Sequence, residues 1–178
     1  MLTAERTERI GVSRHDDRSA PRNDGSAPRA DRAGTAASVV GVKITELSSQ
    51  LSEAAVQLWH DCGLTRPWND PHEDLRRALR GPDSTVLACL REAELLGTAM
   101  VGHDGHRAWV YYLAVRGDQR RQGVGRALMR ASEEWTVTRG VPKLQLMVRA
   151  GNEPALAFYA RLGYDVNDVV VLGRRLDS

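Results

Sequence analysis

The stretch LAVRGDQRRQGVGRALMR, residues 113–130, decides the fold of this chain. Its apolar start ends at Val115, a basic turn follows, and Gly123 and Gly125 open a segment in which apolar residues recur every three or four positions. The recurring residues are Val124, Ala127, Leu128, Ala131 and Trp135. This spacing puts one apolar face on a helix. The stretch therefore predicts a strand, a tight turn and a helix packed on a sheet.

The predicted helix has an unusual charge at its start. Arg120, Arg121 and Arg126 surround its first turn, and no acidic residue occurs in the helix before Glu133. A helix N-terminus carries partial positive charge and normally attracts acidic or capping residues. Cations there cost free energy unless an anion binds, and the two glycines leave the backbone N–H groups accessible to one. The stretch therefore predicts a site for a phosphate-type ligand.

Composition limits the classes of protein to consider. The chain has 178 residues and a formal net charge of +2, which fits one domain with a substantial core and does not indicate a uniformly basic nucleic-acid surface. Cys62 and Cys89 have no partner spacing, so we expect reduced thiols, with neither a disulfide nor a metal site. No apolar run reaches the roughly 18–20 residues of a membrane span, and no signal-peptide core follows Met1. We expect a cytoplasmic protein without membrane or nucleic-acid partners.

The chain divides into a tail and a domain. Residues 1–38 are rich in Arg, Asp, Ser, Ala and Gly and hold few large apolar residues, so we expect a disordered N-terminal tail. An arm that touches nucleic acid or a partner and a mis-assigned start codon are the alternatives. Residues 39–178 form the predicted folded domain.

The predicted elements alternate between strands and helices. In order, we expect a strand at 39–44, a helix at 47–62, a short helix that starts after Asp70, strands at 85–90, 95–101 and 108–115, the glycine helix, a strand at 144–148, a helix from Asn152 to Leu162 and a closing strand at 169–172. This order predicts an α/β (α+β) fold with one mixed sheet flanked by helices.

With this order, the chain resembles the GNAT N-acetyltransferase superfamily over about residues 39–176. The family's acetyl-CoA signature, Gln/Arg-x-x-Gly-x-Gly/Ala, matches Arg120, Gly123 and Gly125. A second signature matches Asn152, Ala155, Tyr159, Leu162, Gly163 and Tyr164. The stretches RPWNDP at 66–71, DGHR at 104–107 and YYL at 111–113 resemble the small bacterial YpeA-like branch. Its relatives modify an amine, and some acetylate the N-termini of ribosomal proteins. The resemblance implies the GNAT fold, with a mostly antiparallel central sheet.

The resemblance also implies how acetyl-CoA is bound. The residues expected to hold its pyrophosphate are Arg120, Arg121, Gln122, Gly123, Val124, Gly125 and Arg126. Leu113 and Val115 would face the pantetheine arm, on a strand that bulges and splays from the next one in this family, and Asn152 and Ala155 complete the cofactor site. The alternatives are a plain strand and a turn that binds nothing. A dinucleotide-binding fold fits less well, because its glycine turn follows the first strand of a parallel unit. A nucleoside-triphosphate P-loop is also excluded, because it needs Gly-Lys-Ser/Thr and this turn does not contain it.

Tyr159 is the predicted general acid, which protonates the leaving thiolate of coenzyme A. Without the signature around it, a tyrosine on an amphipathic helix would more often serve packing. The general base is less defined, because residues 108–115 hold no acid and Met147 stands where ribosomal-protein enzymes carry Glu. His106 is the candidate. The alternatives are that His106 is a solvated turn residue and that a water takes the proton.

We expect the acceptor to lie against Trp68, Asn69 and Tyr111, although Trp68 serves equally well as a loop anchor. The predicted function is transfer of acetyl from acetyl-CoA to a primary amine, on a small molecule or a peptide N-terminus, by direct attack in a ternary complex. Direct attack fits because neither cysteine lies in a cofactor motif. The first alternative is a non-catalytic acyl-CoA-binding or interaction domain, and the second is nucleic-acid binding through the tail. We expect a monomer or a homodimer.

Overall fold

The structure is a computed structural model that describes residues 41–176. The predicted disordered tail, residues 1–38, lies outside the described residues. The elements are β1 (Lys43–Glu46), α1 (Ser52–Asp61), α2 (Pro71–Leu79), β2 (Ser84–Arg91), β3 (Glu94–His103), β4 (Ala108–Val115), α3 (Val124–Val137), β5 (Leu144–Leu146) and α4 (Glu153–Arg161). Short 3-10 turns at Ser49–Leu51 and Gly117–Gln119 precede α1 and α3. No described helix is long and apolar enough to cross a membrane.

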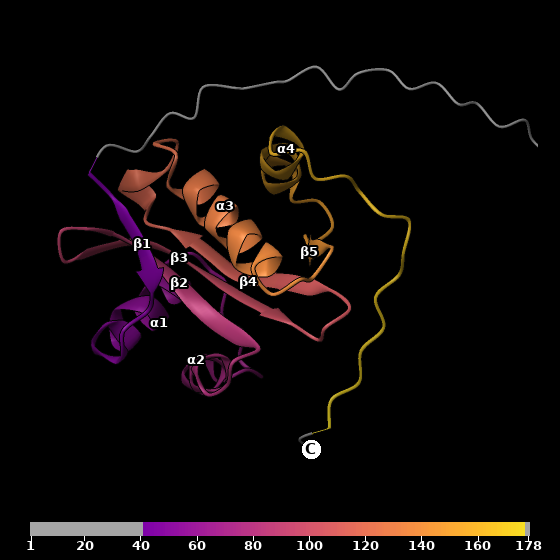
Figure 1. Ribbon diagram of the computed structural model, residues 1–178, viewed down its shortest axis with the longest axis horizontal. Coiled ribbons are helices and arrows are strands. Elements are labelled where there is room, and N and C mark those ends of the chain that lie inside the picture. The colour runs from indigo at the N-terminus through magenta and orange to yellow at the C-terminus, as the bar shows by residue number, and fades with distance from the viewer. Residues whose placement is uncertain (1–40, 177–178) are drawn as a thin grey trace, which may run out of the picture. The chain divides into compact units, whose positions relative to one another are not determined.

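The strands form one mixed sheet in the order β1-β2-β3-β4-β5. Neighbouring strands are antiparallel except β4 and β5, which run parallel with Ala108 opposite Leu144. Helices α1 and α2 cover one face of the sheet, and α3 and α4 lie over the other (Figure 1). This arrangement confirms the predicted sheet flanked by helices.

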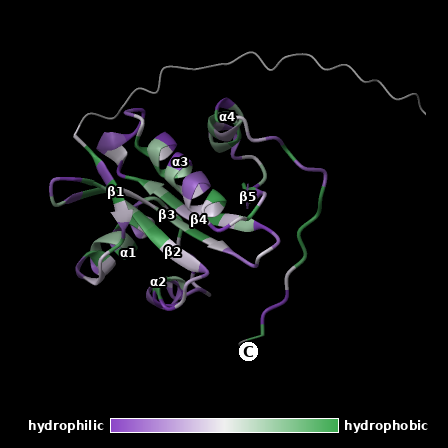
Figure 2. Ribbon diagram, viewed as in Figure 1, coloured by the Kyte–Doolittle hydropathy of each residue, from purple (hydrophilic) through white to green (hydrophobic). Residues whose placement is uncertain are grey.

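Each face of the sheet has its own core. On β2, the side chains of Val86 and Ala88 pack with α1 and α2, whereas those of Leu87 and Cys89 pack with α3. Successive side chains of a strand point to opposite faces, so an unbroken apolar strand serves both cores. Figure 2 accordingly shows mostly apolar colouring in the middle strands and both colours on the helices.

The strand β4 is irregular where it approaches the site. Its register with β3 shifts between Thr98 and Met100, and Tyr112 has a φ of 48°. Positive φ is uncommon for a residue other than glycine and is a recurrent feature of strained or functional segments. On the other edge, β5 pairs only with Ala108–Val110. The second half of β4 is therefore bulged and has no β5 partner, which is the splayed geometry that the resemblance implied.

Several predicted elements differ from the structure. The strand predicted at 39–44 is shifted, because β1 runs over Lys43–Glu46 and residues 39–40 lie outside the described part. The helix predicted at 47–62 begins only at Ser52, after the 3-10 turn. The strand predicted at 169–172 is wrong, because residues 165–176 form no strand and Val170 and Leu172 are 86% and 90% exposed. A run of β-branched residues favours a strand only where it packs on a pleated surface, and this run buries almost nothing. The strand predicted at 144–148 ends two residues early, at Leu146. Met147 and Val148 leave the sheet and line a cavity instead.

Candidate functional site

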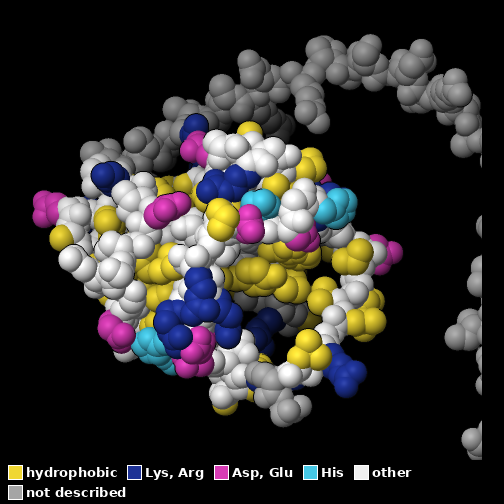
Figure 3. All heavy atoms as spheres, turned by 60° about the horizontal axis from the view of Figure 1, so that its bottom comes forward, with side chains coloured by type: hydrophobic (Ala, Val, Ile, Leu, Met, Phe, Trp, Pro, Cys, Tyr) yellow, Lys and Arg dark blue, Asp and Glu magenta, His cyan; other side chains and the backbone are white. Residues whose placement is uncertain are grey.

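Two cavities adjoin the second half of β4. Cavity A, of about 810 Å³, lies between the β4–α3 turn and α4. Cavity B, of about 820 Å³, lies among the α1–α2 loop, α2, β4 and the segment after β5. Figure 3 shows the face of the molecule that carries α2, with Lys and Arg side chains gathered beside a hollow. Both volumes are in the range of small-molecule sites.

Cavity A collects most of the residues predicted to hold the cofactor. The predicted residues that line it are Leu113, Val115, Arg120, Arg121, Gln122, Gly123, Gly125, Arg126 and Ala155. Tyr159 also lines it. The remaining cofactor candidates are placed differently: the side chain of Val124 is buried in the core under α3, and Asn152 lines cavity B. Asn152 also caps α4, because its Oδ1 accepts from the Ala155 N–H at 3.3 Å.

The helix α3 starts at this cavity without a side-chain cap. Gly123 stands at the N-cap position with a φ of 91°, and no acidic residue occurs in the first turn. At Gly125, an added Cβ would lie 3.3 Å from the Phe158 ring, tighter than ordinary contact. The free N–H groups at a helix start attract anions. The two glycines therefore leave this helix start open to an anionic ligand in cavity A.

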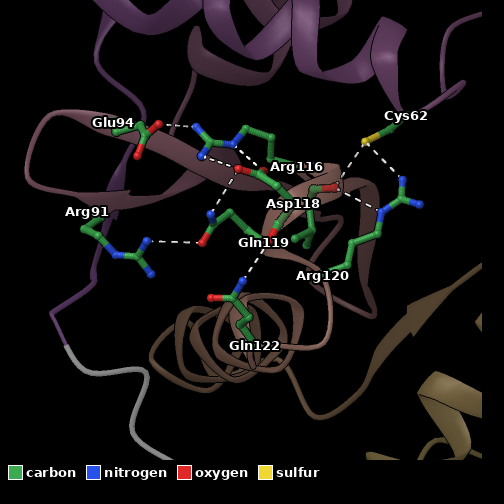
Figure 4. Close-up of polar contacts among 9 residues, drawn as sticks. Cys62, Arg91, Glu94, Arg116, Asp118, Gln119, Arg120 and Gln122 are labelled. Atoms are coloured by element: carbon green, nitrogen blue, oxygen red, sulfur yellow. Dashed lines mark hydrogen bonds and ion pairs between the residues drawn. The ribbon is translucent and has the colours of Figure 1, made fainter.

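An ion-pair cluster holds the turn before the glycines. Arg116 donates from Nε to Asp118 Oδ1 at 2.6 Å and from a terminal nitrogen to Asp118 Oδ2 at 2.8 Å, and it also pairs with Glu94 (Figure 4). The hydrogen bonds from Arg116, with a smaller contribution from Gln119, lower the pKa of Asp118 to about 2. The carboxylate therefore stays charged at neutral pH, and the positive charge of Arg116 is matched within the turn.

Two glutamines complete the support of this turn. Gln119 is buried, and its side chain donates to Asp118 at 3.2 Å and accepts from Arg91 at 3.2 Å. Gln122 donates to the Asp118 carbonyl oxygen at 2.8 Å. Hydrogen bonds of a buried side-chain amide such as that of Gln119 help to define a local conformation. The turn is thus fixed by its own side chains together with Arg91 of β2 and Glu94 of β3, as Figure 4 shows.

The other arginines at cavity A differ from Arg116, because they form no ion pair with a described acidic side chain. Within residues 41–176, no acidic side chain pairs with Arg120, Arg121 or Arg126, and the same holds for Arg161 of α4. Arg120 makes only long contacts, 3.5 Å to the Val115 carbonyl oxygen and 4.0 Å to the Cys62 sulfur. Arg161 was not predicted, because an arginine in the last turn of a helix is ordinary helix chemistry. Cavity A therefore presents a cationic wall to its contents.

Four residues line both cavities. They are Leu64, Leu113, Ala155 and Tyr159. The Tyr159 ring makes edge contacts with Phe158 and Tyr164 at centroid distances of 5.0 and 6.0 Å. Burial raises the pKa of Tyr159 to about 12. The phenol is therefore protonated at neutral pH, and it stands at the junction of the two cavities.

Cavity B collects the three predicted acceptor residues, Trp68, Asn69 and Tyr111. Trp68 is 60% exposed, so its ring is accessible to a ligand. His106 is placed elsewhere. It lies in the turn between β3 and β4, lines neither cavity, and its backbone N–H donates to Asp104 Oδ1 at 2.8 Å. As a general base, His106 stays a prediction from the sequence.

A tyrosine–aspartate pair in cavity B was missed by the sequence reasoning. The Tyr112 hydroxyl donates to Asp74 Oδ2 at 2.7 Å, and the Tyr112 ring stacks on Trp59 at 4.1 Å between centroids. Burial and the Asp74 carboxylate raise the pKa of Tyr112 well above its usual range. Among the described residues that line either cavity, Asp74 is the only acidic one. Nothing in the sequence around Asp74 distinguishes it from the other acids of α2.

Within residues 41–176, no cluster of three or more His, Cys, Asp or Glu side chains is arranged to hold a metal ion. Both cysteines are free, Cys62 half-buried at cavity A and Cys89 buried in the core.

Comparison with known proteins places this geometry in a family. Residues 51–164 match the acetyltransferase (GNAT) family. The chain is 41% identical to an acetyltransferase of Pectobacterium atrosepticum over 124 residues, which are 70% of this chain and 88% of that protein. An acetyltransferase of Yersinia pestis is 40% identical with the same coverage.

A solved structure supports the fold. The aminoglycoside N-acetyltransferase AAC(6')-Iy, in complex with the bisubstrate analogue CoA-S-monomethyl-acetylneamine, is 16% identical and superposes with a TM-score of 0.65 over 75% of this chain and 97% of its own. At that identity the likeness concerns the fold alone. The family match and the two curated relatives establish that this chain belongs to the GNAT acetyltransferase family.

Proposed function

We propose that this chain transfers an acetyl group from acetyl-CoA to a primary amine by direct attack in a ternary complex. The observation that carries the proposal is the junction at Tyr159, where a cavity suited to an anionic donor meets a second cavity with room for an acceptor. The structural neighbour AAC(6')-Iy holds a bisubstrate analogue that joins coenzyme A to an acceptor, which is consistent with two adjoining sites. Membership of the YpeA-like branch stays a prediction from the sequence.

Cavity A has the features that coenzyme A requires. The N–H groups between Gln122 and Arg126 would bind the pyrophosphate, because Gly123 and Gly125 keep side chains away from them. Arg120, Arg121 and Arg126 have no acidic partner in the described part of the chain and would balance the phosphate charge. The unpaired edge of β4 at Leu113 and Val115 offers backbone groups to the pantetheine amides, in the manner of an added strand.

Tyr159 is the proposed general acid. The amine nitrogen attacks the thioester carbonyl carbon, a C–N bond forms, the C–S bond breaks, and the Tyr159 hydroxyl donates its proton to the departing thiolate. A phenol with a pKa of about 12 is always protonated under physiological conditions and is therefore available as a donor. Burial raises the pKa of a thiol as well, so the departing thiolate is a stronger base in the same dry environment and accepts the proton more readily.

The proton of the attacking amine needs an acceptor in cavity B. His106 lies outside that cavity, and Asp74 already accepts from Tyr112 and Arg77. We therefore favour a water in cavity B as the first acceptor of the proton, which was the alternative to a side-chain base. A water can accept the proton without a carboxylate or imidazole side chain beside it. This route therefore agrees with the side chains that line the cavity.

Two measurements test the proposal. Saturating acetyl-CoA should raise the melting temperature, because a ligand that binds only the folded state stabilises it. Thiol release from acetyl-CoA across a panel of amines should then identify acceptors. Stabilisation without thiol release for any amine would favour the non-catalytic acyl-CoA-binding alternative. No stabilisation at all would remove the basis of the proposal.

A further inference from the structure

The charge balance of cavity B says what kind of amine it accepts. Three arginines and one aspartate line the cavity: Arg66, Arg77, Arg149 and Asp74. Both carboxylate oxygens of Asp74 already have partners, because Arg77 donates to Oδ1 at 2.6 Å and the Tyr112 hydroxyl donates to Oδ2 at 2.7 Å. The Arg77–Asp74 pair is therefore neutral as a unit. What remains in the cavity is the positive charge of Arg66 and Arg149.

These two arginines have no acidic partner among residues 41–176. The Arg66 guanidinium donates to the carbonyl oxygens of Gly63 and Thr65, which orient it without neutralising it. Arg66 lines cavity B together with Tyr112 and Asp74, the polar pair of the cavity. The exposed Arg149 follows β5 and has no hydrogen bond or ion pair from its guanidinium to any described residue.

The rest of the lining fits a small, partly apolar ligand. Trp68, Met100 and Met147 offer apolar contact. The Tyr111 hydroxyl and the Asn69 amide offer neutral hydrogen-bonding groups. An arginine fork binds carboxylate and phosphate groups with paired hydrogen bonds. A ligand with several ammonium groups would instead meet two uncompensated positive charges.

From this balance we propose that the acceptor is a primary amine that also carries an anionic group, a carboxylate or a phosphate, which Arg66 and Arg149 bind. The proposal rests on the proposed acetyl transfer and specifies its substrate. The amine end reaches the junction at Tyr159 and the anionic end lies toward the two arginines. A polycationic amine such as an aminoglycoside is disfavoured by the same charges.

The test compares matched amines on the full chain. Amino acids of increasing chain length are compared with their carboxamides, phosphoethanolamine is compared with ethanolamine, and an aminoglycoside is included. We expect kcat/KM for the anionic member of the best pair to exceed that of its neutral partner by about tenfold or more, the usual value of a charge-assisted contact. The carboxylate and phosphate pairs show which anion is preferred.

Charge variants locate the effect. Arg149→Gln should reduce the preference sharply, because Arg66 alone then supports it, and Arg149→Glu should turn it toward neutral or cationic amines. The melting temperature should be unchanged, because this guanidinium makes no hydrogen bond or ion pair with a described residue. Arg80→Gln is the matched control, since Arg80 ends α2 but lines neither cavity. Equal rates for charged and neutral partners, a preference that survives in Arg149→Glu, or an aminoglycoside as best acceptor would overturn the proposal.

Calorimetry separates this inference from the enzymatic one. Binding of N-acetylated carboxylates and phosphates to the CoA-saturated protein reports on the anion site without turnover. Measurable binding that weakens about tenfold in Arg149→Gln supports the anion site even if no amine is acetylated. Absence of binding by both anion types, together with turnover of neutral amines, would reject the anion site and leave the acetyltransferase proposal intact.

Discussion

Cavities A and B have nearly the same volume but are built differently. Apart from Arg161 of α4, the basic side of cavity A comes from one short stretch, residues 119–126, which also holds Gly123 and Gly125. Cavity B draws single side chains from the α1–α2 loop, α2, β3, β4 and the segment after β5. The first cavity therefore depends mainly on the backbone of one turn, whereas each side chain that lines the second can be replaced without changing the others. The following variants are ordered from the largest expected effect to the smallest.

The junction between the cavities should give the largest effect. Tyr159→Phe removes the proton donor while keeping the ring contacts with Phe158 and Tyr164, so we expect kcat to fall by about 10²–10⁴-fold with coenzyme A affinity nearly unchanged. Steady-state kinetics and calorimetry with coenzyme A measure the two quantities. The control is Tyr164→Phe, which loses a hydrogen bond to Glu133 but lines neither cavity. Normal turnover in Tyr159→Phe would remove this residue from the acid role.

Steric filling of the helix start should affect cavity A alone. Gly125→Val places a branched side chain next to Phe158, where even a Cβ would lie at 3.3 Å. We expect acetyl-CoA affinity to fall by about 10- to 100-fold, because the side chain also covers the N–H groups of the first turn. Gly81→Val is the control, since nothing lies within 4 Å of its added Cβ. An unchanged affinity with a folded variant would show that the donor is not held at this turn.

The unmatched arginines of cavity A should have a moderate, salt-dependent effect. Arg121→Gln and Arg126→Gln each remove one exposed charge, and we expect acetyl-CoA affinity to drop by about 3- to 10-fold at low salt and less at high salt. Titrations at two ionic strengths measure this. Arg130→Gln, whose guanidinium pairs with Glu134 on the exposed side of α3, provides the comparison. Equal losses in all three variants would mean that the effect is not local to the cavity.

The smallest expected effect is a pH dependence of stability. The pKa of Asp118 is about 2 in the folded chain and about 3.9 in an unfolded one, so its contribution is present above about pH 4 and is lost as the pH falls toward 2. Asp118→Asn should therefore melt slightly lower than the wild type at pH 5–8, and the difference should vanish near pH 2. A constant difference across that acid range would contradict the assignment of the low pKa to the Arg116 pair.

The sequence predicted cavity A better than cavity B for a physical reason. The open start of α3 follows from local facts, namely two glycines, three arginines and no early acid, and the structure confirms the uncapped helix with Gly123 at a positive φ. Asn152 caps α4 through an equally local contact, in which its Oδ1 accepts from the Ala155 N–H. Arg161 was missed because its position in the cavity depends on how α4 packs, which no local pattern contains.

Cavity B depends on contacts between residues that are distant in the chain. The pairing of Tyr112 with Asp74 requires that α2 cover β4 at one register, and Arg149 reaches the cavity only because β5 ends at Leu146. The strand predicted at 169–172 is wrong for the same reason. Strand propensity shows that these residues would suit a sheet, but whether a neighbouring strand lies beside them depends on distant parts of the chain. Trp68, Asn69 and Tyr111 were placed together only through the family resemblance.

The four residues that belong to both cavities link the two binding events. A ligand seated in cavity A against Leu113 and Tyr159 becomes part of the wall of cavity B. Each ligand then changes the affinity of the other by the same factor, since such coupling is reciprocal at equilibrium. In kinetic terms, whichever ligand binds first would help to complete the surface that receives the second.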